Sequence, residues 1–176
     1  MRDFRFRQIG VIRTPFDDPR HAPIQPVYAK GVAGRVDVLP EFTEGLGDIE
    51  GFSHVHLVYV FHRSTETRLR VKPYLQDVER GIFATRAPCR PNPIGMSLVR
   101  LVGREGNVLH VEDVDALDGS PLLDIKPYVP RFDVRPDARA GWQEDVDDET
   151  AERLGRPLDA GGPGDRDPKR DRGRPE

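Results

Sequence analysis

The sequence is poor in cysteine and in long apolar runs. Cys89 is the only cysteine among 176 residues, so no disulfide can form within the chain, which agrees with a cytoplasmic location. No stretch approaches the length of a membrane-spanning helix. The opening MRDFRFRQIG is charged and alternating, unlike a secretory signal. We therefore expect a cytoplasmic protein that has no contact with a membrane.

Glycine-rich phosphate-binding motifs are also missing. The stretch KGVAG, residues 30–34, has the wrong glycine spacing for such a motif and no helix is predicted after it. The sequence GGPG lies in the C-terminal part, where no strand is predicted before it. A nucleotide site of the Rossmann type is therefore not supported.

Helical periodicity is nearly absent before residue 140, and short runs typical of strands take its place. In HVHLVYVFH, the strongest of them, Val55, Leu57 and Tyr59 share one face of the predicted strand. The other runs are FRFRQIGVI, GRVDVL, LRVKPY, GIFAT, MSLVRLV, NVLHVEDV and LLDIKPY. Many short strands separated by Gly/Pro turns predict a mainly β fold, a barrel or a sandwich, over residues 4–135.

The chain changes character after Pro136. The stretch WQEDVDDETAERLG predicts one short helix, capped by Asp147 or Asp148 and ending at Gly155. The sequence beyond has too little apolar surface to pack, so we expect a disordered tail. Residues 136–176 are therefore predicted to form an acidic extension with a short helix.

Charge is distributed unevenly along the chain. Residues 1–135 hold 19 Lys+Arg against 18 Asp+Glu, and residues 136–176 hold 8 against 12. Within the first part, residues 62–104 carry nine basic and three acidic residues. This basic stretch favours an anionic partner such as RNA; solvated strand edges would account for the same composition.

The basic stretch contains a segment stiffened by proline, GIFATRAPCRPNPIGMSL. Three prolines in eight residues exclude a helix and disfavour a central strand. We expect a rigid loop that presents Arg86, Arg90 and Asn92 in fixed directions, and these groups suit anionic or planar ligands. Arg90 and Asn92 are our candidates for substrate binding. An ordinary proline-rich surface loop is the alternative.

Other candidate sites are weaker. Three histidines share the outer face of the predicted strand 54–62, but His54 and His62 are too far apart along a strand to bind one ion, and we expect no metal site. Cys89 has no identifiable base and is interpreted as an incidental thiol. An Asp-Gly turn at residues 118–119, with Asp115 and Asp124 around it, is either solvated or a carboxylate loop that accepts hydrogen bonds from a ligand.

Several of these segments resemble one family. GIFATRAPCRPNPIGMSLV, LDGSPLLDIKPY, GFSHVHLVYVFHR, PIQP and IGVIRTP are similar to motifs of the TrmO family, also called TsaA-like or YaeB-like proteins. The resemblance runs from about Phe4 to Asp133. It implies a single β-barrel that uses S-adenosylmethionine, acts as a homodimer and methylates N6 of threonylcarbamoyladenosine beside the tRNA anticodon.

The resemblance also implies which residues form the site. Its cofactor contacts fall on Pro23, Gln25, His62, Arg63, Arg86, Asp115 and Leu117. Other relatives have glutamine where this chain has Arg63. Because catalysis of methyl transfer is mainly alignment, the remaining task is removal of the proton of N6, for which Asp118 is our candidate.

One departure from the family leaves the substrate open. Longer bacterial relatives have a further folded domain after the barrel, whereas this chain has about forty mostly polar residues after Pro136. The alternatives are methylation of another nucleic acid or of a small metabolite, or a binding module for S-adenosylmethionine or RNA without turnover.

Overall fold

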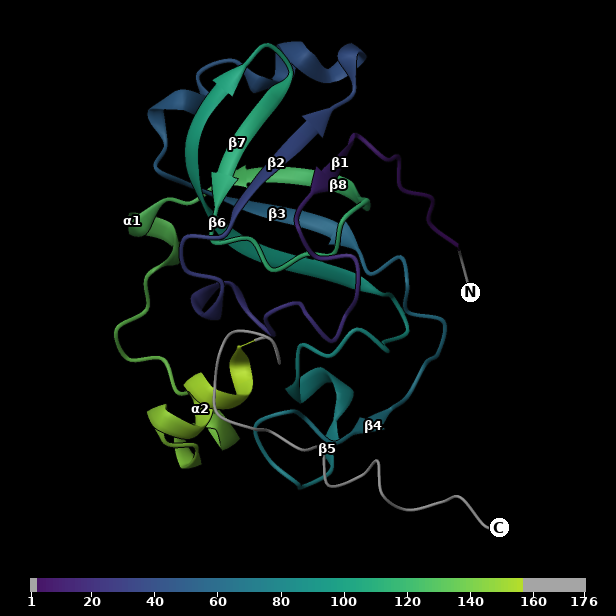
Figure 1. Cartoon of the computed structure of the whole chain (residues 1–176), viewed down its shortest axis with the longest axis vertical. Helices are drawn as coiled ribbons and strands as arrows, with labels where there is room; N and C mark the ends of the chain where they lie inside the picture. Colours follow the sequence, from purple (N-terminus) through teal and green to yellow (C-terminus); the bar gives the residue numbers. More distant parts are fainter. Residues whose placement is uncertain (1–2, 157–176) are drawn as a thin grey trace.

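The computed structural model describes residues 3–156 and consists of an antiparallel barrel with long loops at one end. The barrel closes in the spatial order β1-β2-β7-β6-β3-β8 (Figure 1). Its strands are β1 (Gly10–Arg13), β2 (Ala33–Val38), β3 (His54–Val60), β6 (Ile94–Glu105), β7 (Val108–Glu112) and β8 (Ser120–Pro127). This arrangement confirms a mainly β barrel.

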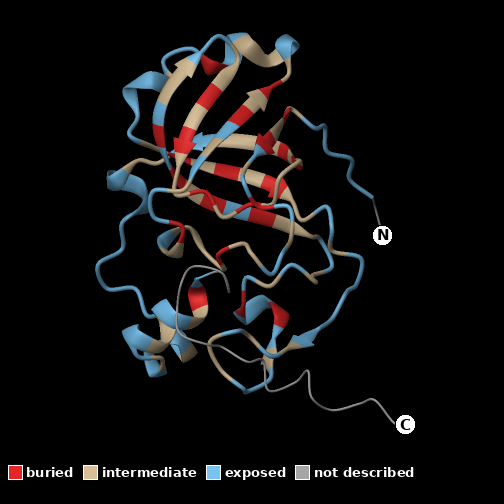
Figure 2. Cartoon of the chain, in the orientation of Figure 1, coloured by how far each residue is buried: buried red, intermediate tan, exposed pale blue. Residues whose placement is uncertain are grey.

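Alternation of side chains along the strands builds the core. In β3, Val55, Leu57 and Tyr59 are buried and their neighbours are only partly covered. In β6, Val99 and Leu101 point inward in the same way. Buried residues accordingly gather on the strands (Figure 2), because each strand places every second side chain inside the barrel.

Three predicted strands are wrong in part. Residues 3–9 form no strand, and LRVKPY contributes only β4 (Arg70–Val71), which pairs with β5 (Arg80–Gly81) outside the barrel. GIFAT contains the 3-10 helix η4 (Ile82–Ala84) instead of a strand. The reason lies in Thr85, whose backbone N–H and hydroxyl both donate to the Ile82 carbonyl and close a turn there.

The remaining elements are short. They are η1 (Pro26–Tyr28), η2 (Pro40–Leu46), η3 (Ile49–Gly51), α1 (Pro130–Asp133), η5 (Gly141–Asp145) and α2 (Asp148–Gly155). The predicted helix is confirmed as α2, and Asp147 caps it by accepting the Thr150 N–H at 2.8 Å. Gly155, the last residue of α2, is buried. The disordered tail was predicted beyond this helix, and residues 157–176 of it lie outside the described residues.

Gly95, near the start of β6, lies too close to two aromatic rings for a side chain to fit. An added Cβ would lie 2.6 Å from the Tyr59 ring and 2.9 Å from the Phe61 ring. We expect Gly95→Ala to destabilise the fold by roughly 1–3 kcal/mol, the range for overpacked cores. Urea unfolding measures the loss of stability. Gly103→Ala on the same strand is the matched control, because nothing lies within 4 Å of a Cβ added at Gly103. Equal stability of both variants would contradict this packing.

Candidate functional site

The ten residues that the sequence analysis assigned to cofactor binding, substrate binding or catalysis lie on loops at one end of the barrel. Because neighbouring strands are antiparallel, the ends of β1, β3 and β7 meet the beginnings of β2, β6 and β8. Three loops therefore converge there, residues 14–32, 61–93 and 113–119. Together they hold Pro23, Gln25, His62, Arg63, Arg86, Arg90, Asn92, Asp115, Leu117 and Asp118.

Gln25 and Arg86 join the first two loops. Gln25 precedes η1 with an extended backbone, and its Nε2 donates to the Ile24 carbonyl at 2.6 Å. This bond orients the amide so that Oε1 accepts from Arg86 Nη1, also at 2.6 Å. Pro23, two residues before Gln25, is buried. The structure thus brings two predicted cofactor residues, 61 positions apart, into direct contact.

Asp115 adds an acid from the third loop. Burial of its carboxyl group raises the pKa of Asp115 to about 6, while the hydrogen bond from Ser97 and the positive charge of Arg86 act in the opposite direction. Near neutral pH the group is therefore mainly ionised and close to the Arg86 charge. An arginine and a carboxylate side by side suit a ligand that carries charges of both signs.

Sequence reasoning missed the two side chains behind Asp115. Ser97 Oγ donates to the Asp115 carboxylate and lies 3.1 Å from the Tyr59 hydroxyl. Since the Ser97 proton is directed at Asp115, the Tyr59 hydroxyl is the donor to Ser97. Both residues are buried inside the barrel, and burial raises the pKa of Tyr59, so this donor stays protonated. A serine at an inward position of an apolar strand was the available signal.

His62 and Arg63 lie at the end of β3. His62 Nδ1 is 3.4 Å from Ser120 Oγ at the start of β8. Partial burial and the neighbouring Arg63 charge lower the pKa of His62 below its ordinary value, so the ring is neutral at pH 7. Arg63 Nη1 donates to the Asp17 carbonyl at 2.5 Å, which ties it to the loop that also carries Gln25.

Asp118 holds the turn between β7 and β8 against the end of β1. One carboxylate oxygen accepts the Thr14 N–H at 3.2 Å, and the other lies 3.6 Å from Arg13 Nη1. Its own N–H donates to the Phe16 carbonyl, and the Leu117 carbonyl accepts from Ser120 N–H. Both Asp118 oxygens thus have partners, and the side chain remains partly exposed at the rim of the site.

The polar groups of the proline-rich loop have different surroundings. Arg90 Nη1 donates to the carbonyls of Thr85 and Ala87, at 3.0 and 3.3 Å, so Arg90 braces the loop from within. Asn92 is exposed and lines a separate hollow with Phe4 and Phe6. Within residues 3–156, Arg86 is the only one of the three that forms a hydrogen bond with another predicted site residue, Gln25.

Five of the nine basic residues in the stretch 62–104 form ion pairs with acidic side chains. Within residues 62–104, Arg68, Arg70 and Lys72 pair with the three acidic residues of the same stretch. Arg100 and Arg104 pair with Glu112 and Glu50. The other four basic residues of the stretch, Arg63, Arg80, Arg86 and Arg90, donate hydrogen bonds to uncharged carbonyl or amide oxygens. Of these four arginines, Arg63 and Arg86 are predicted cofactor residues of the site.

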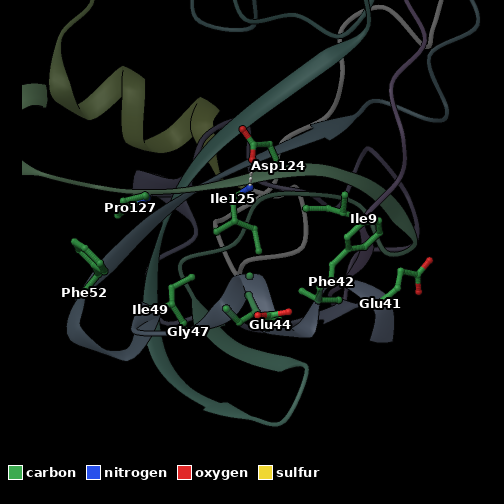
Figure 3. Close-up of a pocket in the computed structure, with 13 residues that line it drawn as sticks. Ile9, Glu41, Phe42, Glu44, Gly47, Ile49, Phe52, Asp124, Ile125 and Pro127 are labelled. Atoms are coloured by element: carbon green, nitrogen blue, oxygen red, sulfur yellow. Dashed lines mark hydrogen bonds between the residues drawn. The ribbon is translucent and has the colours of Figure 1, made fainter.

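A cavity lies at the opposite end of the barrel. It measures about 640 Å³ and is lined mainly by η2, η3 and β8, with Phe42, Ile49 and Ile125 among its apolar residues (Figure 3). Asp124 belongs there, where it forms an ion pair with Lys126 at 2.8 Å. Asp124 is thus separated from Asp115 and Asp118, with which the sequence analysis grouped it.

Residues 3–156 contain no group of three or more His, Cys, Asp or Glu side chains arranged to hold a metal ion. His54 and His56 instead lie against the Tyr128 ring, with ring centroids 6.3 and 5.8 Å apart. No helix in this part of the chain is long and apolar enough to span a bilayer.

Comparison with known proteins connects this site to one family. The sequence model of the tRNA-methyltransferase O N-terminal domain matches residues 11–134. A probable S-adenosyl-L-methionine-binding protein of Pyrococcus abyssi is 59% identical over 139 residues, covering 79% of this chain and 76% of that protein. A tRNA (adenine(37)-N6)-methyltransferase of Escherichia coli is 37% identical over 154 residues, covering 82% of this chain.

Solved structures agree with the sequence comparison. The crystal structure of TrmO from Pseudomonas aeruginosa matches with a TM-score of 0.68 and 40% identity, over 80% of this chain and 63% of that one. The chain spans 66% of the length of the E. coli methyltransferase. The residues that the family model matches, 11–134, include the three loops described above and almost all of the barrel.

Proposed function

The chain belongs to the tRNA-methyltransferase O N-terminal domain family, and from this membership we propose that it transfers the methyl group of S-adenosylmethionine to N6 of an adenosine in tRNA. The observation that carries the proposal is the convergence of Gln25, Arg86 and Asp115 from three loops. S-adenosylmethionine bears a carboxylate, an ammonium group and a sulfonium, and a site with an arginine next to an acid fits this mixture of charges.

In this proposal the residues of the chain bind and orient. The cofactor supplies an electrophilic methyl group; a bond from N6 to that carbon forms, and the carbon–sulfur bond breaks. Gln25, Arg86 and Asp115 hold the cofactor together with Pro23, His62, Arg63 and Leu117, as the family resemblance implies. The hydrogen bonds from Tyr59 to Ser97 and from Ser97 to Asp115 hold the Asp115 carboxylate in place before the cofactor binds. The side chain therefore loses less conformational freedom on binding.

The proton of N6 must also leave, and Asp118 is our candidate acceptor. Its carboxylate lies at the rim of the site, where one oxygen accepts the Thr14 N–H and the other faces Arg13. Asp115 is the second candidate, because its raised pKa brings it closer to the range of an effective general base.

The variant Asp118→Asn distinguishes two roles of Asp118, that of proton acceptor and that of a residue that holds the turn between β7 and β8. If Asp118 accepts the proton, kcat should fall at least a hundredfold, the usual range for general-base removal, while the affinity for S-adenosylmethionine changes less than about threefold. Steady-state kinetics with tRNA and calorimetry with the cofactor measure the two quantities. Comparable losses in both, with a lower melting temperature, would assign Asp118 to the turn alone.

For the substrate we propose threonylcarbamoyladenosine next to the anticodon. Support comes from the family resemblance of the Arg86–Gly95 and Asp118–Tyr128 segments and from the positive charge around Arg63 and Arg86. The test is methyl transfer to tRNA with and without the threonylcarbamoyl group. Equal transfer to both would assign the activity to unmodified adenosine, and no transfer to either would contradict tRNA methylation.

The cytoplasmic location and the homodimer stay predictions of the sequence. Sedimentation of the purified protein tests the homodimer, with a mass of about 40 kDa expected from two chains of 19.9 kDa.

A further inference from the structure

The segment after the barrel returns to the end that carries the site. Residues 135–155 lie beyond the part that the family model matches and contain η5 and α2. In Figure 1 they occupy the lower half of the view, near the β4–β5 hairpin and away from the cavity of η2 and η3. Two of their residues, Trp142 and Gly155, contact the loops of the site.

Gly155 contacts the loop that carries Gln25. Its carbonyl accepts the Ile24 N–H at 3.0 Å. An added Cβ at Gly155 would lie 2.4 to 2.6 Å from three atoms of the Tyr28 ring, so the end of α2 packs on that ring without room for a side chain. Ile24 precedes Gln25, and its carbonyl holds the Gln25 amide. Gly155 thus holds this loop in two ways, by a hydrogen bond to the Ile24 backbone and by packing against the Tyr28 ring.

Trp142 contacts the loop that carries Arg86. Its Nε1–H donates to the Ala84 carbonyl at 2.7 Å, two residues before Arg86. The Arg80 guanidinium lies over the indole, 5.6 Å from the ring centroid, and Gln76 Nε2 lies 3.5 Å from the Trp142 carbonyl. The indole is therefore held in place on one side by a cation and on the other by the backbone of η4.

The two contacts bracket the hydrogen bond between Gln25 and Arg86. We propose that residues 141–155 act as a clamp that presets this pair for S-adenosylmethionine, with Trp142 and Gly155 as positioning residues that do not touch the cofactor. The inference rests on the proposed function in naming the ligand. Its physical basis is that loops fixed before binding lose less conformational freedom when the ligand arrives.

The test compares three folded variants. Trp142→Phe keeps an aromatic ring over Arg80 but removes the donor to Ala84, and Gly155→Ala pushes the Tyr28 ring away. Glu152→Ala, at an exposed position of α2 where Glu152 accepts from Arg156, is the matched control. We expect Trp142→Phe and Gly155→Ala each to weaken S-adenosylmethionine binding about five- to tenfold by calorimetry, and to raise its KM with kcat unchanged.

Amide hydrogen exchange supplies a second readout without cofactor. In Gly155→Ala the Ile24 amide should exchange at least tenfold faster, while amides in β3 and β6 keep their protection; Glu152→Ala should change neither. Unchanged Ile24 exchange, or unchanged cofactor affinity in both clamp variants, would overturn the clamp. If the unaltered protein fails to bind S-adenosylmethionine, the proposed function fails and the ligand assigned to the clamp fails with it. Faster Ile24 exchange would then still support the contact between α2 and the loop.

Discussion

Replacing Arg86 by alanine is expected to weaken S-adenosylmethionine binding about ten- to hundredfold while the barrel stays folded. Arg86 donates to Gln25 across two loops and places its charge near Asp115. Loss of one charge-assisted contact costs roughly 1.5–3 kcal/mol, which corresponds to that range of affinity. Calorimetry with the cofactor measures the change.

Arg68→Ala is the control for Arg86→Ala. Arg68 belongs to the same basic stretch, but it is exposed and paired with Glu66, so its removal lowers the net charge equally without touching the site. We expect the Arg68 variant to bind the cofactor like the unaltered protein. Equal affinities of all three proteins would remove Arg86 from the site.

The second large effect concerns Asp115 and pH. Because its pKa is about 6 in the folded protein, we expect affinity for the cationic cofactor to rise about tenfold between pH 5 and pH 7, as the carboxyl group ionises. In Asp115→Asn this pH dependence should disappear, and affinity at pH 7.5 should be at least tenfold lower. Titration calorimetry at several pH values measures both. A variant with the same pH profile as the unaltered protein would contradict this role.

Stability should change in the opposite direction. The folded-state pKa of Asp115 lies above the ordinary value of 3.8, so the fold binds the proton more tightly than the unfolded chain does. The contribution of Asp115 to stability is therefore complete below pH 4 and is lost as the pH rises through 6. Asp115→Asn should gain up to about 3 kcal/mol over the unaltered protein at pH 8 and nothing at pH 4. Asp124→Asn, at the opposite end, is the control.

Local patterns in the sequence predicted the elements that depend on local chemistry. The alternation in HVHLVYVFH fixes which side chains of β3 enter the core, and Asp147 caps α2 because its carboxylate needs only a backbone N–H three residues later. GIFAT was predicted as a strand because its composition is apolar. Its backbone instead turns at Ile82, where Thr85 provides a local hydrogen-bond partner.

The sequence named candidate residues for the site but could not predict the contacts between them. The family motifs named Gln25, Arg86 and Asp115, but only the closed barrel brings together residues that are 29 to 90 positions apart in the sequence. Ser97 and Tyr59 escaped prediction because a serine or a tyrosine in an apolar strand has no motif of its own. The contact of Gly155 with Tyr28 was hidden for the same reason, since a buried glycine at a helix end looks like an ordinary stop signal.

The most direct measurement of the central claim is methyl transfer by the purified chain from labelled S-adenosylmethionine to tRNA, with nucleoside mass spectrometry to locate the methyl group. The claim predicts one methyl group on N6 of the adenosine beside the anticodon, and loss of the signal in Arg86→Ala. A protein that binds S-adenosylmethionine but leaves every tRNA nucleoside unlabelled would contradict the claim.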